Sequence, residues 1–159
     1  MSLFHRRIVA DTRPLGAHWA RACAAIHAAS FAYPWTATEV ENLLREPNVL
    51  ADAALDTKSV RLYGFVLSRL AADEAEVLAI ATDPAFRRHG IARTLLGAHL
   101  GRLQGAAVKV LFLEVDEQNS PARALYARFG FEMVGRREGY YRTREGSRSS
   151  ALILRRKME

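Results

Sequence analysis

Between residues 77 and 131 the chain passes twice from a short apolar run to a segment with helical periodicity. Residues 77–81 form a bounded apolar run that predicts a buried strand, which Asp83-Pro84 ends. Apolar residues then recur at helical spacing from Ala92 to Leu103, so a helix is predicted to begin at Gly90. Residues 110–115 predict a second buried strand. Because strands joined through a helix pair in parallel, this stretch predicts a mixed α/β fold.

The loop between the first strand and its helix has the composition of an anion-binding turn. The first amides of a helix have no partner inside it, and the helix dipole places partial positive charge where they point. Gly90 allows a ligand close to the backbone, and Arg87, Arg88 and Arg93 add positive charge. The loop lacks Gly-Lys-Ser/Thr and Gly-x-Gly-x-x-Gly, so it is neither a nucleoside triphosphate loop nor a dinucleotide loop. By itself, such a glycine is more often only a turn.

A second helix is predicted after residues 110–115. Ser120 is predicted to cap it, with Pro121 at its first helical position, and Gly130 to end it. Together with the preceding loop, this region contains Arg-x-x-Gly-x-Ala followed by Asn-x-x-Ala-x-x-Leu-Tyr-x-x-x-Gly-Phe. These two motifs, over about a third of the chain, resemble the GNAT superfamily of acetyl-CoA-dependent N-acetyltransferases.

The resemblance implies acetyl-CoA as co-substrate and a mixed, mostly antiparallel sheet flanked by helices. It also implies that the two central strands separate, with the pantetheine arm between them. The residues that it assigns to the coenzyme are the backbone of Ile80, Ala81 and Thr82, the loop Arg87, Arg88, His89, Gly90, Ile91, Ala92 and Arg93, and the side chain of Asn119.

The remaining segments predict the rest of an α/β (α+β sandwich) fold. Strands are predicted over residues 3–10, 49–55, 60–70, 131–135 and 151–154, and helices over residues 15–29 and 36–45. Thr36 and Glu39 form a predicted capping box at the start of the helix over residues 36–45. With no repeat or interdomain linker, we expect residues 1–159 to form a single N-acetyltransferase domain.

Glu114 is the predicted general base. An α-amino group has a pKa near 7.7–8.0, so at neutral pH a base must remove a proton from most of it. Glu114 continues a strand face with Val110 and Phe112, and an apolar face disfavours the charged form of a carboxyl group. The pattern alone fits a solvent-exposed glutamate equally well. The resemblance to the N-terminal acetyltransferase branch implies the base.

Tyr126 is the predicted general acid. It shares a helical stripe with Ala122, Leu125 and Phe129, and this spacing by itself favours a core tyrosine. The resemblance implies instead that its hydroxyl lies beside the thioester sulfur and protonates the leaving thiolate.

Two aromatic clusters are predicted on loops, and they suggest the acceptor. Loop packing alone would explain them. However, Phe-x-x-Pro-Trp from residue 31 and Arg-Arg-x-x-Tyr-Tyr from residue 136 resemble the bacterial ribosomal-protein-alanine N-acetyltransferases. The implied acceptor is the N-terminal alanine of a small-subunit ribosomal protein, and the implied substrate-binding residues are Tyr33, Trp35, Tyr140 and Tyr141.

Composition limits the other classes of function. The net charge of +6 favours polyanionic partners, but no RNA-binding pattern is present, so we predict no specific nucleic-acid binding. Cys23 is alone, and the five histidines show no ligand spacing, so we predict no metal. Lacking an apolar N-terminal segment and any run of about 18 apolar residues, the chain is expected to be cytoplasmic, with no membrane partner.

Alternatives to a protein N-terminal acetyltransferase stay open. One is a GNAT enzyme for a small amine such as an antibiotic, a polyamine or an amino acid. A polyamine site would require clustered carboxylates, which the predicted loops lack. The other is a non-catalytic module that binds acyl-CoA or nucleic acid, against which Glu114 and Tyr126 argue.

Overall fold

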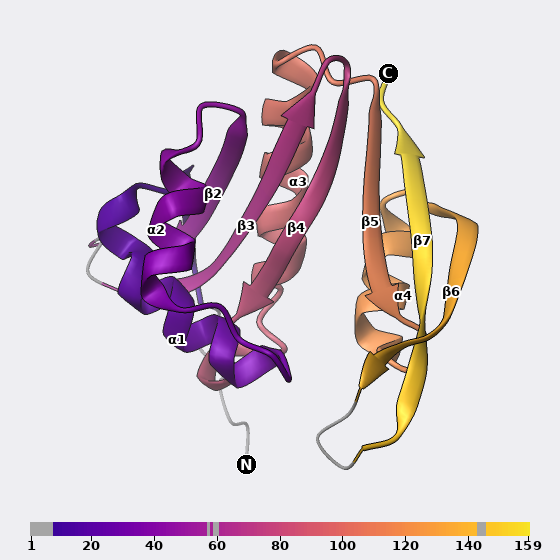
Figure 1. Ribbon diagram of the computed structural model, residues 1–159. Coiled ribbons are helices and arrows are strands. Elements are labelled where there is room, and N and C mark those ends of the chain that lie inside the picture. Colours follow the sequence, from indigo (N-terminus) through magenta and orange to yellow (C-terminus); the bar gives the residue numbers. More distant parts are fainter. Residues whose placement is uncertain (1–7, 57, 59–60, 143–145) are drawn as a thin grey trace, which may run out of the picture.

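The computed structural model describes residues 8–56, 58, 61–142 and 146–159. Within them, seven strands form one sheet in the order β1-β2-β3-β4-β5-β7-β6. The strands are β1 (Asp11–Pro14), β2 (Val49–Leu55), β3 (Leu62–Ala71), β4 (Glu74–Thr82), β5 (Val110–Asp116), β6 (Glu132–Arg142) and β7 (Arg148–Lys157). β4 and β5 pair in parallel, and every other neighbouring pair of these strands is antiparallel. The predicted mixed, mostly antiparallel sheet is confirmed (Figure 1).

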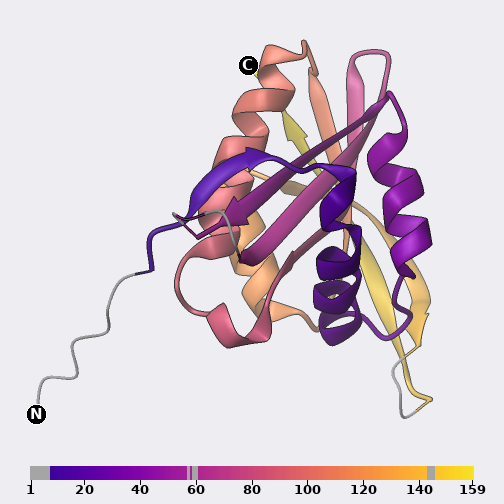
Figure 2. The same cartoon turned by 90° about the vertical axis from the view of Figure 1, so that its left-hand side faces the viewer.

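Helices cover the two faces of this sheet unequally. They are α1 (Ala20–Ser30), α2 (Ala37–Arg45), α3 (Ile91–Gly105) and α4 (Ser120–Arg128), with short 3-10 turns η1 (Ala17–Trp19) and η2 (Pro84–Phe86). The apolar stripes of α3 and α4 pack on one face, over a core that includes Leu95, Leu111 and Tyr126. α1 and α2 cover the other face over β2 to β4 (Figures 1 and 2). Among the described residues, β5, β6 and β7 contribute nothing to that second core.

The two central strands separate soon after they pair. β4 and β5 are in register only from Glu74 opposite Val110 to Glu76 opposite Phe112. Beyond that point β4 pairs only with β3, and β5 only with β7. Figure 1 shows β4 and β5 diverging toward their carboxyl ends. The strand separation that the GNAT resemblance implies is therefore present.

A β-bulge at Leu78 accounts for the separation. Val77 and Ala79 both have partners on β3, whereas Leu78 between them has none. The extra residue reverses the alternation of the strand, so Ala75 and Val77 face the core under α3 while Ala79 and Ala81 face the core under α1. Because a bulge bends its strand and increases the local twist, β4 turns away from β5 at this position.

The first helices and strands differ in detail from the prediction. Of the strand predicted over residues 3–10, residues 3–7 lie outside the described residues and residues 8–10 are not a strand. The first strand is β1, which pairs with the end of β2. The helix predicted over residues 15–29 begins only at Ala20, after the turn η1. β6 and β7 are longer than the predicted 131–135 and 151–154.

The caps of α2 and α4 give one confirmed and one wrong prediction. At α2, the Glu39 amide donates to Thr36 Oγ1 (3.1 Å) and the Thr36 amide donates to Glu39 Oε2 (3.0 Å), which confirms the capping box. At α4 the cap is Asn119 and not Ser120, because Asn119 Oδ1 accepts the Ala122 amide at 3.2 Å. An asparagine side chain reaches the third amide of the helix as well as a serine does.

A buried polar network attaches α3 to β2 and β3. His99 is fully buried; its Nδ1 lies 2.7 Å from Asp52 Oδ2 and its Nε2 lies 2.7 Å from Ser68 Oγ. Arg102 Nη1 donates to Asp52 Oδ1 and, at 3.0 Å, to the carbonyl oxygen of Ala51. Burial of polar groups is costly unless each finds a partner, and these do. The network therefore holds α3, the helix that follows the Gly90 loop, in one position on the sheet.

Candidate active site

The loop between β4 and α3 presents a series of free backbone amides. From Arg87 to Arg93, no amide donates a hydrogen bond to any part of the chain that the structure describes. Gly90, the residue that caps α3, has φ of +74° and Arg88 has φ of +67°. A left-handed conformation costs a non-glycine residue about 1–2 kcal/mol, so Arg88 holds local strain. Left-handed residues beside a helix N-terminus turn successive amides toward one side, which suits an anion.

The ends of the separated strands offer a further row of backbone groups. Apart from the bulged Leu78, residues 77–82 of β4 pair with β3 on one side and with none of the described strands on the other, and this segment includes Ile80, Ala81 and Thr82. A strand edge without a partner can bind an extended ligand through its amide and carbonyl groups. The free loop amides follow this edge directly in the chain. An extended ligand with a phosphate group at one end fits both features.

Glu114 lies beyond the part of β5 that pairs with β4, on the face that α1 and α2 leave uncovered, and its backbone is opposite Ile153 of β7. Its side chain is 21% exposed, and Oε1 lies 3.3 Å from Nη2 of Arg137 on β6. On the same strand face Phe112 precedes it and Asp116 follows it. The surroundings of Glu114 are therefore more polar than the strand pattern predicts. The sequence interpretation did not include Arg137, which is 23 residues away in the chain.

Tyr126 extends from α4 into the core. It is 5% exposed and its ring lies 5.6 Å from that of Phe131, edge to face, so the predicted core position is confirmed. No side-chain hydrogen bond among the described residues involves its hydroxyl, and since every fully buried side-chain nitrogen or oxygen there has a partner, this hydroxyl is open to solvent. Burial raises the pKa of Tyr126 to about 12, and the charge of Tyr141 adds to this effect. The phenol therefore keeps its proton across the neutral pH range.

Tyr141 lies near both Glu114 and Tyr126. Burial, together with Glu114, Tyr140 and Asp116 and partly opposed by Arg137, raises the pKa of Tyr141 to about 12. Because Tyr141 also raises the pKa of Tyr126, residues from β5, β6 and α4 form one cluster. The ring of Tyr140 lies 5.2 Å from that of Tyr141 and is 53% exposed.

The connection between α1 and α2 holds the other aromatic cluster. Trp35 stacks on the His27 ring at 4.3 Å, and its amide donates to His27 Nδ1 at 3.1 Å. Burial lowers the pKa of His27 to about 4, partly opposed by Glu39, so the ring is neutral at neutral pH and can accept that hydrogen bond. Tyr33, by contrast, is 71% exposed. Trp35 is thus anchored by packing, whereas Tyr33 is free for a ligand.

His27 was not among the predicted site residues, because a histidine within an alanine-rich helix gives no distinctive pattern. Figure 1 shows this α1–α2 connection and the adjoining ends of β6 and β7 at the same end of the sheet, on opposite sides of the separated strands. Asn119, which the GNAT resemblance assigns to the coenzyme, uses its side-chain Oδ1 to cap α4. Its backbone amide donates to the carbonyl oxygen of Asp116 at 2.9 Å, whereas its side-chain Nδ2 makes no hydrogen bond to the described residues.

The described residues contain neither a group of side chains suited to a metal ion nor a helix suited to crossing a membrane. No three side chains among their histidines, cysteines, aspartates and glutamates are grouped so as to hold a metal ion. None of the helices in that part of the chain has the length and apolar character needed to cross a membrane.

Comparison with known proteins gives consistent matches. The model of the acetyltransferase (GNAT) family matches residues 19–131. The chain is 36% identical over 98 residues to the [ribosomal protein bS18]-alanine N-acetyltransferase of Haemophilus ducreyi, covering 62% of this chain and 68% of that protein. The Escherichia coli enzyme of the same name is also 36% identical over 98 residues, covering 62% and 66%.

Solved structures extend the similarity over nearly the whole chain. The crystal structure of the ribosomal-protein-S18-alanine N-acetyltransferase from Escherichia coli has a TM-score of 0.87 at 27% identity and covers 95% of both chains. Arabidopsis thaliana NAA60 in complex with acetyl-CoA has a TM-score of 0.81 at 21% identity, covering 94% of this chain and 99% of that one. The second similarity concerns the fold alone.

Proposed function

Since the chain belongs to the acetyltransferase (GNAT) family and is an N-acetyltransferase, we propose that it acetylates the N-terminal α-amino group of a protein. The proposed donor is acetyl-CoA, and the proposed acceptor is the N-terminal alanine of ribosomal protein bS18. The names and identities of the relatives support this acceptor. Such an acceptor would require the reaction to occur in the cytoplasm. We treat residues 1–159 as one catalytic domain.

The observation that carries the proposal is the continuity of three features. The free amides of residues 87–93 follow the unpaired edge of β4, and across the separation lies the cluster of Glu114, Tyr126 and Tyr141. In this proposal the loop amides bind the pyrophosphate of coenzyme A, and the backbone of residues 80–82 pairs with its pantetheine arm. Bound acetyl-CoA supplies an acetyl thioester that an uncharged amine can attack. The side chains supply the proton transfers.

Glu114 is the proposed base and Tyr126 the proposed acid. At neutral pH most of an α-amino group is protonated, and Glu114 accepts that proton directly or through one water molecule. Tyr126, with a pKa of about 12, retains its proton until a thiolate leaves beside it. The exposed rings of Tyr33 and Tyr140, with Trp35 and Tyr141 beside them, contact the first residues of the acceptor peptide.

The direct test is incubation with acetyl-CoA and short peptides that differ in their first residue, read by mass spectrometry. We expect one acetyl group on the α-amine of the alanine-initiated peptide of bS18, and less on peptides that begin with a bulky residue. Acetylation of small amines with none on any peptide would contradict the proposed acceptor.

Gly90→Val is expected to abolish the stabilisation of the protein by acetyl-CoA. At 100 times its dissociation constant, a ligand stabilises the native state by about 2.7 kcal/mol, which raises Tm by about 5–10 °C for a chain of this size. A β-branched residue at φ of +74° distorts the loop and blocks close approach to its amides. Differential scanning fluorimetry with and without acetyl-CoA measures the shift.

Gly101→Val is the matched control, because Gly101 is exposed on the same helix and a Cβ there meets no atom within 4 Å. It should keep the full shift. A folded Gly90→Val variant with the same shift as wild type would show that the loop does not bind the coenzyme.

Tyr126→Phe is expected to lower kcat by about 10²-fold while leaving the free energy of unfolding nearly unchanged. The substitution keeps the packing of the ring and removes a hydroxyl that has no hydrogen-bond partner among the described residues. Steady-state kinetics and urea unfolding measure the two effects. A stable variant with the wild-type rate would show that Tyr126 serves only the core.

A further inference from the structure

The strand β6 has an irregularity directly before Tyr141. Arg137 pairs with Ala151 and Tyr141 pairs with Ser149, so three residues of β6 lie opposite the single residue Ser150. Two residues are therefore in excess on β6. In a strand, two residues span about 7 Å, so the excess draws Tyr141 back by that length toward the row of Glu114. A regular β6 would leave Tyr141 farther from the proposed base.

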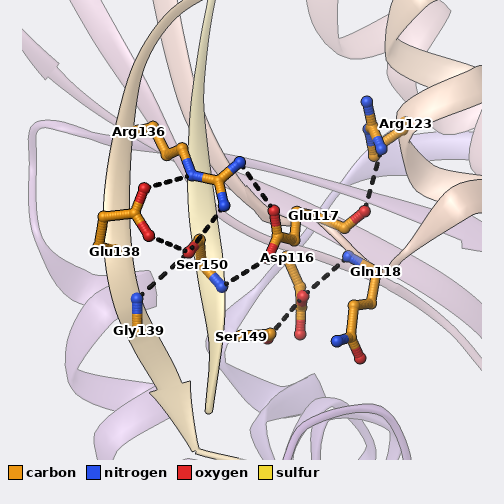
Figure 3. Close-up of polar contacts among 9 residues, drawn as sticks. All are labelled: Asp116, Glu117, Gln118, Arg123, Arg136, Glu138, Gly139, Ser149 and Ser150. Carbon is orange, nitrogen blue, oxygen red and sulfur yellow. Dashed lines mark hydrogen bonds and ion pairs between the residues drawn. The ribbon is translucent and has the colours of Figure 1, made fainter.

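The Ser150 side chain is at the centre of the contacts that hold this bulge. Ser150 Oγ accepts the Gly139 amide at 3.2 Å and lies 3.4 Å from both Arg136 Nη2 and Glu138 Oε2. Gly139, one of the residues in the bulge, has φ of +59°, and a residue with a side chain adopts this conformation only with strain. Ser150 itself is 4% exposed. The bulge is thus built on one buried hydroxyl group (Figure 3).

Charged side chains from β6 and from the residue that follows β5 surround the same serine. Arg136 pairs with Glu138 at 2.8 Å and with Glu117, just beyond β5, at 3.0 Å. Glu117 Oε1 in turn accepts the Ser150 amide at 3.2 Å. Figure 3 shows these side chains converging on Ser150 from β6 and from the end of β5. A single ion pair at the surface contributes little, but a connected set fixes geometry.

On these grounds we propose that Ser150 is a positioning residue that sets acceptor binding: it holds the β6 bulge so that Tyr140 and Tyr141 face the acceptor beside Glu114. The inference rests on the proposed function, because it concerns how that site receives its amine. Ser150 itself does not contact the substrate. Its effect passes through the backbone of Gly139 to the two tyrosines that follow.

Ser150→Ala is expected to raise KM for the acceptor peptide roughly tenfold, because it leaves the half-buried Gly139 amide without its acceptor and so frees the bulge. Within about threefold, kcat should be unchanged, and the dissociation constant of acetyl-CoA should not change, since the loop amides lie on another element. Ser150→Thr keeps the hydroxyl and should restore KM. Gly139→Ala should raise KM independently: its Cβ would meet Arg148 at 3.6 Å without a clash, so only the backbone is strained.

Ser68→Ala is the matched control, because it also removes a buried serine hydroxyl from this sheet. That hydroxyl is on β3, where it bonds to His99 and not to the β6 bulge. It should lower stability without a selective change in KM. Hydrogen exchange gives a readout independent of turnover: the Gly139 amide should lose protection in Ser150→Ala and keep it in Ser68→Ala.

All kinetics use the acceptor that wild type acetylates best, so an error in the proposed acceptor is detected in wild type alone and leaves this comparison intact. A folded Ser150→Ala variant with wild-type KM and a protected Gly139 amide would overturn the inference. Equal changes in KM, kcat and coenzyme affinity, as from general loosening, would overturn it as well.

Discussion

Glu114→Gln is expected to lower kcat/KM for a peptide acceptor by about 10²–10⁴ at pH 7. Glutamine keeps the shape of the side chain and can still contact Arg137, but it cannot accept the proton of the amine. The loss should be largest at neutral pH, where the α-amino group is mostly charged, and should shrink at high pH as free amine accumulates. A pH series of kcat/KM for wild type and variant measures both effects.

Glu132→Gln is the matched control for charge and size, because Glu132 is exposed at the start of β6 and has no ion pair among the described residues. It should leave the pH profile unchanged. Coenzyme affinity should be the same in both variants, since the loop amides and not β5 hold the phosphates. Full activity of Glu114→Gln at pH 7 would show that the proton leaves by another route.

His99→Leu is expected to lower the free energy of unfolding by about 2–5 kcal/mol, because it leaves two buried polar groups without a hydrogen-bond partner at about 1–3 kcal/mol each. Leucine fills much of the space of the ring but leaves Asp52 Oδ2 and Ser68 Oγ buried without their partner. Because domains of this size are stable by only about 5–15 kcal/mol, the loss is a large part of the total. Urea unfolding of wild type and variant measures it.

The sharper form of this experiment compares single and combined replacements. If unpaired polar atoms are the cause, Asp52→Leu and Ser68→Ala added to His99→Leu should recover much of the loss, because no buried group then lacks a partner. Arg102→Gln should cost less than His99→Leu, since the Arg102 side chain is 41% exposed and can turn to water. A loss below about 1 kcal/mol in His99→Leu would show that the network contributes little to stability.

Features that depend on neighbours in the chain were predictable. The buried strand over residues 110–115, the capping box at Thr36, the helix that begins after Gly90 and the core position of Tyr126 all follow from spacing over a few residues. The capping of a helix also depends on neighbouring residues, but two adjacent residues can be equally suitable caps. Asn119 and Ser120 are both good caps, and their order in the sequence does not decide between them.

What only the tertiary structure decided depends on contacts between distant residues. The bulge at Leu78 arises because β4 packs Val77 in the core under α3 and Ala79 in the core under α1. The sequence of the strand alone does not indicate which helix covers which face. Glu114 pairs with Arg137, which is 23 residues away in the chain. The Gly139 amide donates to Ser150 Oγ, which is 11 residues away. Local periodicity determines which side chains share a face, whereas strand register and bulges determine which of them meet across elements. The elements of the site were therefore predictable, and the arrangement of its chemical groups was not.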